Sequence, residues 1–238
     1  MYSYKSRVRY SECDGDGRLT LVSMIDYLQD CSTFHSEELG LGFRELKQKG
    51  YGWILAAWRI EIDRLPEFGE EIDVRTWCYE MKSLHAMRNF EILDAKGTSC
   101  VRAESQWLLY SLKDNKVVRI PSELEAYVED TPRIPMPKMQ RKLRAEGPGT
   151  QASPITVGEQ FLDSNGHVNN AQYVLMAIGA LEELGVEAPM STVSVQYRSM
   201  ARLGDVVVPV VHDAEDGRTI ELLSNMGEVY AIVKLQER

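Results

Sequence analysis

The sequence predicts an α+β fold built from two similar halves, each pairing one helix with an antiparallel sheet. Three observations predict it. Each half contains one long amphipathic segment, four extended segments follow that segment, and the order of elements is the same in both halves. A helix followed by a four-stranded antiparallel meander can bury its apolar face only if the sheet curls around it. Two such units in one chain would form a pseudo-twofold dimer.

The composition of the 238 residues is that of a globular protein, with 44% hydrophobic and 26% charged residues. The net charge of −9 argues against nonspecific nucleic-acid binding, which needs a basic surface. No apolar run reaches membrane-spanning length, and the first residues lack the apolar core of a signal peptide. The four cysteines contain no C-x-x-C pair. We therefore expect a cytoplasmic protein with reduced thiols and with no membrane or nucleic-acid partner.

The first half begins with a weak strand signal over 4–10 and continues into a helix. Thr20 suits the N-cap of this helix, and Gly40 suits its C-terminal end. Between them apolar residues recur at helical spacing: Leu21, Met24, Ile25, Leu28, Cys31 and Leu39. His35 falls on the same stripe, where we expect a hydrogen-bonded core residue rather than a catalytic one. Four strands follow, over 53–63, 71–79, 84–93 and 100–112.

A segment rich in proline and in basic residues separates the two halves. It predicts a division into a first domain over 1–130, a linker over 131–150 and a second domain over 151–238. Two interpretations of its basic side chains stay open. They are either a solvated connector or a docking patch for an acidic partner. The residues concerned are Arg133, Lys138, Arg141, Lys142 and Arg144.

The second half repeats the order of the first. A strand is expected over 155–161 and a helix over 171–184, which Asn169 or Asn170 can cap and Gly185 can end. Four more strands are expected, over 192–198, 206–212, 218–223 and 228–235.

The stretch from Asp163 to Asn170 carries a carboxylate, a carboxamide and an imidazole just before the second helix. A helix N-terminus supplies backbone N–H donors and a partial positive charge, which suits carbonyl chemistry. Asp163 lies 149 positions after Asp14, which opens a similar turn before the first helix. Turn formation alone explains the first copy, because Asp and Asn form such turns readily. It does not explain His167, which stands where the first copy has Arg18.

The pattern Asp-x-Asn-x-His-Val-Asn-Asn, with an aromatic residue at 173, resembles the acyl-[acyl carrier protein] thioesterases. Segments of the first half resemble the N-terminal domain of that family: 10–14, 17–21, 27–30, 52–55, 59–62 and 76–77. The resemblance implies a tandem double hot-dog fold, each half an antiparallel sheet wrapped around a central helix. It also implies hydrolysis of fatty acyl thioesters on acyl carrier protein in fatty acid biosynthesis, without a metal or organic cofactor. A homodimer is left open.

The family places a catalytic Asp, Asn and His in this motif, which carry over to Asp163, Asn165 and His167. Family members also have an acidic residue and a Cys shortly after a Tyr-Arg pair. Here Met200 and Ala201 occupy those two positions, so a cysteine nucleophile is excluded there. We expect His167 and Asp163 to activate water together and Asn165 to hold the water or the carbonyl. Backbone N–H groups over 168–170 are the expected oxyanion donors.

The resemblance also assigns acyl-chain binding to the first domain and catalysis to the second. Three candidates would line an apolar channel beside the first helix: Trp53, Met24 and Leu28. For each of them taken singly, ordinary core packing is the more favoured interpretation. Acyl carrier proteins are acidic, so Arg7 and Arg9, together with the basic residues over 133–144, are candidates for docking.

Two alternatives stay open at this point. One is a hot-dog thioesterase that acts on acyl-CoA. The other is a noncatalytic acyl-binding protein that kept the fold, which the missing acid at position 200 allows. A hydratase on the same fold is disfavoured by the Asp-x-Asn-x-His motif.

Overall fold

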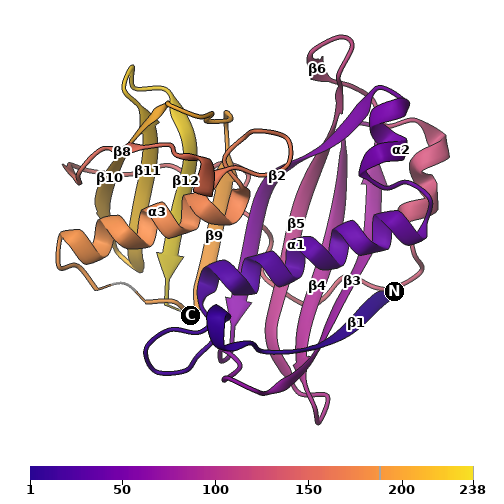
Figure 1. The fold of residues 1–238 in the computed structure, drawn as a ribbon, viewed down its shortest axis with the longest axis horizontal. Helices are drawn as coiled ribbons and strands as arrows, with labels where there is room; N and C mark the ends of the chain where they lie inside the picture. Colours follow the sequence, from indigo (N-terminus) through magenta and orange to yellow (C-terminus); the bar gives the residue numbers. More distant parts are fainter. Residues whose placement is uncertain (188, 238) are drawn as a thin grey trace. The chain divides into compact units, whose positions relative to one another are not determined.

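The computed structural model describes residues 1–187 and 189–237, which form two compact units (Figure 1). The first unit comprises Met1–Ala56 and Ile62–Lys138, and the second comprises Ala57–Glu61 and Met139–Arg238. Each unit contains one long helix and an antiparallel sheet, so the predicted α+β class is confirmed. No helix in the described part of the chain is long and apolar enough to span a bilayer.

In the first unit, helix α1 lies across one face of the sheet (Figure 1). The helix spans Leu21–Glu38, and the strands follow the order β1-β3-β4-β5-β2. Their bounds are β1 Tyr2–Arg7, β3 Glu71–Lys82, β4 His85–Asp94, β5 Ser99–Ser111 and β2 Tyr51–Ile62. The smaller elements are η1 Tyr10–Glu12, α2 Phe43–Gln48, β6 Lys116–Val117 and η2 Ser122–Tyr127.

Helix α1 begins and ends as the sequence predicts. The Thr20 hydroxyl accepts the Ser23 N–H at 3.2 Å, which satisfies one of the unpaired donors of the first turn. Gly40 follows the helix at φ +66°, a conformation that glycine adopts without strain. The apolar stripe, including Met24 and Leu28, is buried against the sheet. His35 is also buried and hydrogen-bonded, so its prediction as a core residue is confirmed.

In the second unit, helix α3 spans Asn170–Glu183 and the strands follow the order β9-β12-β11-β10-β7. Residues Ala57–Glu61 of β2 belong to this unit because they pair antiparallel with β9, with Trp58 opposite Val195. The bounds are β9 Thr192–Tyr197, β12 Val229–Gln236, β11 Gly217–Ser224, β10 Val206–Ala214, β7 Gly149–Gln151, β8 Ile155–Thr156 and η3 Glu159–Phe161.

The strand predicted over 155–161 is wrong beyond its first two residues. Strand pairing stops at Thr156, and 159–161 form the 3-10 turn η3. The Val157 N–H donates to the Asp205 carbonyl at 2.8 Å, which draws the chain away from the strand ladder. The first unit does the same, because the Val8 N–H donates to the Glu70 carbonyl at 3.0 Å before η1. The spacing of apolar residues alone does not predict where the chain leaves the strand ladder.

The segment 131–138, expected as linker, belongs to the first unit and packs on its sheet. Ile134 and Met136 are buried against Trp77, whose indole N–H donates to the Pro132 carbonyl at 3.1 Å. Arg133 bonds to the buried carboxylate of Glu104 at 2.5 Å. Proline prevents helix and ladder pairing but leaves apolar side chains able to pack, so this part is not a solvated connector.

Candidate active site

The turn before α3 is organised by the side chain of Asp163. Its Oδ1 accepts the backbone N–H groups of Asn165 at 2.8 Å and His167 at 3.2 Å. Its own N–H donates to the His167 carbonyl at 2.8 Å. Gly166 adopts φ +75°, which a residue with a Cβ rarely tolerates. Asp163 and Gly166 therefore determine the shape of the turn that carries positions 165 and 167.

The turn is attached to the sheet through the chain that follows β9. The Val168 N–H donates to the Ala201 carbonyl at 3.0 Å, and His167 forms a β-bridge with Arg202. The Asn169 N–H donates to the Phe161 carbonyl at 2.9 Å. The expectation that the N–H groups of Val168 and Asn169 serve as oxyanion donors is therefore wrong, because the fold already uses both.

The three motif side chains differ in exposure. Asp163 and His167 are half-buried, and Asn165 is exposed. The Asn165 amide nitrogen lies 3.4 Å from Asp163 Oδ2, the oxygen that the turn does not use. The His167 imidazole makes no hydrogen bond to any residue that the structure describes. Both imidazole nitrogens are therefore available to water or to a substrate carbonyl, and Asp163 Oδ2 and the Asn165 carboxamide each keep hydrogen-bonding capacity beyond their mutual contact.

Two tyrosines hold the start of α3 in place. The Tyr197 hydroxyl donates to the Asn170 carbonyl at 3.0 Å, and the Tyr173 hydroxyl accepts the Ala201 N–H at 2.9 Å. Burial raises the pKa of Tyr173 to about 12 and raises that of Tyr197 well above its usual value. Both phenols therefore remain neutral and act as anchors. Met200, at the position of the family acid, is 45% exposed beside this anchor.

The first unit contains the same turn with different side chains. Asp14 Oδ1 accepts the N–H groups of Asp16 and Arg18, each at 2.9 Å, and the Asp14 N–H donates to the Arg18 carbonyl. The Leu19 N–H donates to the Pro66 carbonyl at 2.8 Å, as Val168 does to Ala201. The Asp is thus a turn-forming residue in both units, and any catalytic role of the second copy is additional to that one.

The predicted chain-binding residues all lie in the first unit but in different surroundings. Met24 and Leu28 are fully buried on α1. Trp53 is half-buried and packs in the cluster around Tyr127, with the two ring centroids 5.9 Å apart. All three side chains pack in the apolar interior of the first unit. That they line an acyl-chain channel stays a prediction.

A buried charged group near this cluster was not predicted. The Arg88 Nη1 atom donates to His35 Nδ1 at 2.9 Å and to Thr76 Oγ1 at 3.2 Å, and its guanidinium lies 5.7 Å from the Tyr127 ring centroid. Burial and the Arg88 charge lower the pKa of His35 to about 4. His35 is therefore neutral at pH 7, and its Nε2–H faces Glu129 at 3.5 Å. The feature of the sequence that could have indicated this buried charge is an arginine at an inward-facing position of strand β4.

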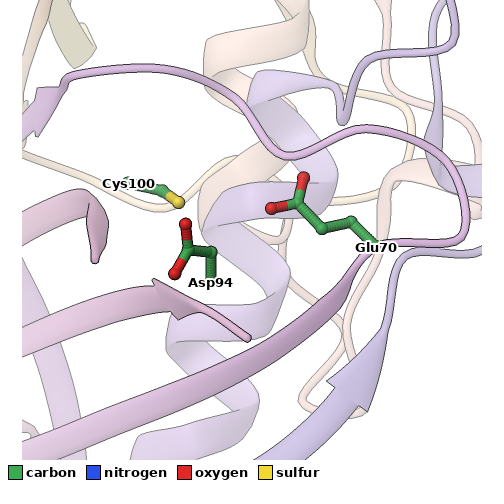
Figure 2. A group of neighbouring side chains, drawn as sticks. All are labelled: Glu70, Asp94 and Cys100. Atoms are coloured by element: carbon green, nitrogen blue, oxygen red, sulfur yellow. The ribbon is translucent and has the colours of Figure 1, made fainter. Parts of the chain in front are cut away.

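Figure 2 shows three side chains with metal-ligating atoms within 4.8 Å of one another: Glu70, Asp94 and Cys100. The Arg64 guanidinium binds both Glu70 oxygens, at 2.9 and 2.5 Å, and Asp94 at 3.3 Å. Arg64 thereby lowers the pKa of Glu70, while burial raises the pKa of Cys100 to about 11. The cluster is a salt bridge beside a neutral thiol, which does not fit a metal centre.

Comparison with known proteins agrees with the predicted fold and with the family that the first half resembles. Residues 1–128 match the family model described as the acyl-ACP thioesterase N-terminal domain. The chain is similar to a solved acyl-ACP thioesterase of Bacteroides thetaiotaomicron, with a TM-score of 0.86 and 25% identity, covering 98% of this chain and 96% of that one. A 12:0-ACP thioesterase of Umbellularia californica gives a TM-score of 0.83 at 18% identity, covering 100% of this chain and 96% of that one. The predicted tandem double hot-dog fold is confirmed.

The chain is also similar to a chloroplast acyl-[acyl-carrier-protein] hydrolase of Cuphea viscosissima. The two are 25% identical over 216 residues, which is 85% of this chain and 52% of the plant protein. The chain spans about half the length of the two Cuphea viscosissima hydrolases that it matches over 216 and 184 residues.

Proposed function

Because this chain belongs to the acyl-ACP thioesterase family, we propose that it hydrolyses fatty acyl thioesters on acyl carrier protein and releases free fatty acid. One observation carries the proposal. The turn at Asp163 repeats the turn at Asp14 bond for bond, yet only the second copy presents a carboxamide and an imidazole. A turn needs neither group, so their presence is explained by chemistry rather than by folding.

Hydrolysis requires a proton acceptor for the attacking water and a proton donor for the thiolate that leaves. An imidazole can perform both steps in succession. In the proposed reaction His167 takes a proton from water as oxygen attacks the thioester carbon. The tetrahedral intermediate then expels the carrier thiolate, which receives that proton. Asp163 Oδ2 orients the water or the imidazole, since Oδ1 is committed to the turn.

The developing oxyanion needs hydrogen-bond donors, and two of the expected backbone groups are committed elsewhere. The Asn165 carboxamide is therefore the proposed donor, with its N–H presently 3.4 Å from Asp163 Oδ2. The positive end of α3 adds a favourable field at the same place. In this proposal the first domain holds the acyl chain near Trp53, Met24 and Leu28, and the second domain performs the reaction.

Replacement of His167 tests the proposal most directly. His167→Ala should lower kcat for an acyl carrier protein thioester by about 100- to 10,000-fold, because the proton acceptor is lost. The matched control is Arg18→Ala, which removes the side chain at the same position of the first turn and should keep kcat within about twofold. Free thiol and free fatty acid are both measured. If His167→Ala retains full kcat, the assigned site is wrong.

The exposed Met200, where the family has an acid, favours a second candidate function, a noncatalytic acyl-binding protein. Binding of an acyl thioester without release of fatty acid by the unmodified protein would establish that alternative. Activity on acyl-CoA in clear preference to the carrier protein thioester would establish an acyl-CoA thioesterase. Both outcomes are read from one assay with a single acyl chain on the two carriers.

A further inference from the structure

A cluster of basic side chains lies in the second unit on residues 141–144 and 198. The segment Met139–Ala145 contains Arg141, Lys142 and Arg144 and no acidic residue, in a chain of net charge −9. All three side chains are exposed, and none forms an ion pair with any residue that the structure describes. Arg198, at the end of β9, is exposed as well. We call these four residues the basic patch.

The backbone of the basic patch is held in place by one buried side chain. Gln196 Oε1 accepts the Leu143 N–H at 2.9 Å, and Gln196 Nε2 donates to the Gln140 carbonyl at 3.0 Å. Leu143 is only 2% exposed, so it anchors the segment from below. Arg198 Nη2 donates to the same Gln196 oxygen at 2.6 Å. A charge run in a solvated linker would lack these anchors, so the cations are presented on a fixed surface.

The basic patch is also tied to the candidate active site within the same unit. Gln196 and Tyr197 are consecutive on β9 and point to opposite faces of the sheet, so this strand binds the patch segment through Gln196 and the first residue of α3 through Tyr197. Arg198 lies four positions before Arg202, which bridges His167. Four extended residues span at most about 14 Å. Arg198, one of the four patch residues, therefore lies within about 14 Å of the residue that bridges the catalytic turn.

We infer that the basic patch docks the protein surface of the acyl carrier protein, an inference that rests on the proposed function. Carrier proteins are acidic, so the positive charge of the basic patch complements them. The whole chain, with a net charge of −9, carries the same sign of charge as the carrier protein. Local complementarity decides such docking and raises the association rate, whereas net charge acts only at long range. Of the basic residues considered from the sequence, Arg133 is not part of the patch because Glu104 neutralises it.

The test is the triple variant Arg141→Glu, Lys142→Glu and Arg144→Glu. Its KM for an acyl carrier protein thioester should rise about tenfold or more, with kcat nearly unchanged, because docking rather than chemistry is lost. Hydrolysis of the same acyl chain on N-acetylcysteamine should not change. The matched control reverses three exposed cations of the first unit, Lys113, Lys116 and Arg119, and should leave both substrates unaffected.

Two results would overturn the inference. One is a carrier-protein KM equal to that of the control variant. The other is an equal rise of KM for acyl-CoA, which would show that the patch binds the phosphates of the carrier arm and not the protein. If the unmodified chain hydrolyses neither carrier thioester, the proposed function itself fails, and this outcome is distinct from both.

A measurement on the unmodified chain covers the case in which the triple variant does not fold. Carbodiimide joins a lysine to a carboxylate only where the two are in contact. Lys142 should form such a crosslink with carboxylates of the carrier protein, and raising the salt concentration should suppress it. Crosslinks confined to lysines of the first unit would contradict the docking surface.

Discussion

The turns at Asp14 and Asp163 have the same backbone hydrogen bonds around different side chains. Each Asp accepts two backbone N–H groups, and the residue after each turn, Leu19 or Val168, donates its N–H to the loop after a strand. The first presents Asp16 and Arg18, and the second presents Asn165 and His167. The difference lets folding be tested apart from the proposed chemistry, because the same backbone turn carries the proposed catalytic side chains in one unit and different side chains in the other.

The loops that receive these turns match equally well. The Glu70 carboxylate accepts the Glu67 N–H at 3.0 Å, and the Asp205 carboxylate accepts the Arg202 N–H at 2.8 Å. Each turn or loop residue named in the second unit therefore has a counterpart in the first unit that can serve as its control. Mutations made in matched pairs therefore distinguish side chains that act in the proposed reaction from side chains that only form the turn.

The largest effect is expected from the pair Asp163→Asn and Asp14→Asn. The Asn oxygen can still accept the two turn N–H groups, so both variants should fold and keep similar melting temperatures. Only Asp163→Asn should lower kcat, by about 100-fold or more, because the charged oxygen Oδ2 is lost. The measurement is kcat together with thermal unfolding. Equal kcat in the two variants would reduce Asp163 to a turn-forming residue.

The sequence was sufficient for the repeated order of elements and for the motif, because both depend on local patterns. Thr20, Gly40 and the apolar stripe of α1 act within one element. The Arg88–His35 pair could not be predicted from the sequence, because its members lie 53 positions apart and meet only after the sheet forms. The donors at Val168 and Asn169 were misjudged for the same reason, because their acceptors belong to other segments.

The next effect concerns His35, the buried histidine of the first unit, in contrast to the half-buried His167. Burial and Arg88 lower its pKa to about 4, below that of the unfolded chain at about 6.5. Between these values the unfolded chain binds more protons. The contribution of His35 to stability is thus complete above pH 6.5 and is lost as the pH falls toward 4. Asp26 opposes it, because burial raises its pKa to about 6.

The variant His35→Asn isolates this contribution, since the Asn oxygen can accept from Arg88 as Nδ1 does but does not titrate. The loss of unfolding free energy between pH 7 and pH 5 should be smaller than in the unmodified chain by roughly 2 kcal/mol. Urea unfolding at the two pH values measures it. His85→Asn, on a more exposed histidine of the same unit, is the control. An unchanged pH dependence in His35→Asn would contradict a neutral buried imidazole.

The two units also differ in the side chains that hold the loops after β2 and after β9. In the first, Arg64 and Asp63 donate backbone N–H groups to the Cys100 carbonyl, and the Arg64 side chain neutralises Glu70. In the second, the chain at 198–199 donates to the Tyr230 carbonyl, and the Tyr230 hydroxyl donates to Asp205 at 3.3 Å. The Tyr230 phenol thus bonds to the loop carboxylate in the second unit, as the Arg64 guanidinium does in the first.

The smallest effect is expected from Arg64→Ala. The pair is partly exposed, so its loss should lower the free energy of unfolding by only about 1 kcal/mol, or about 2–4 °C in melting temperature. The variant also leaves Glu70, Asp94 and Cys100 without a cation between them. Zinc should then raise the melting temperature of Arg64→Ala but not that of the unmodified chain, because there the guanidinium occupies the position between the carboxylates. An equal rise in both proteins would mean that Arg64 does not exclude the metal, and the cluster would have to be regarded as a zinc site.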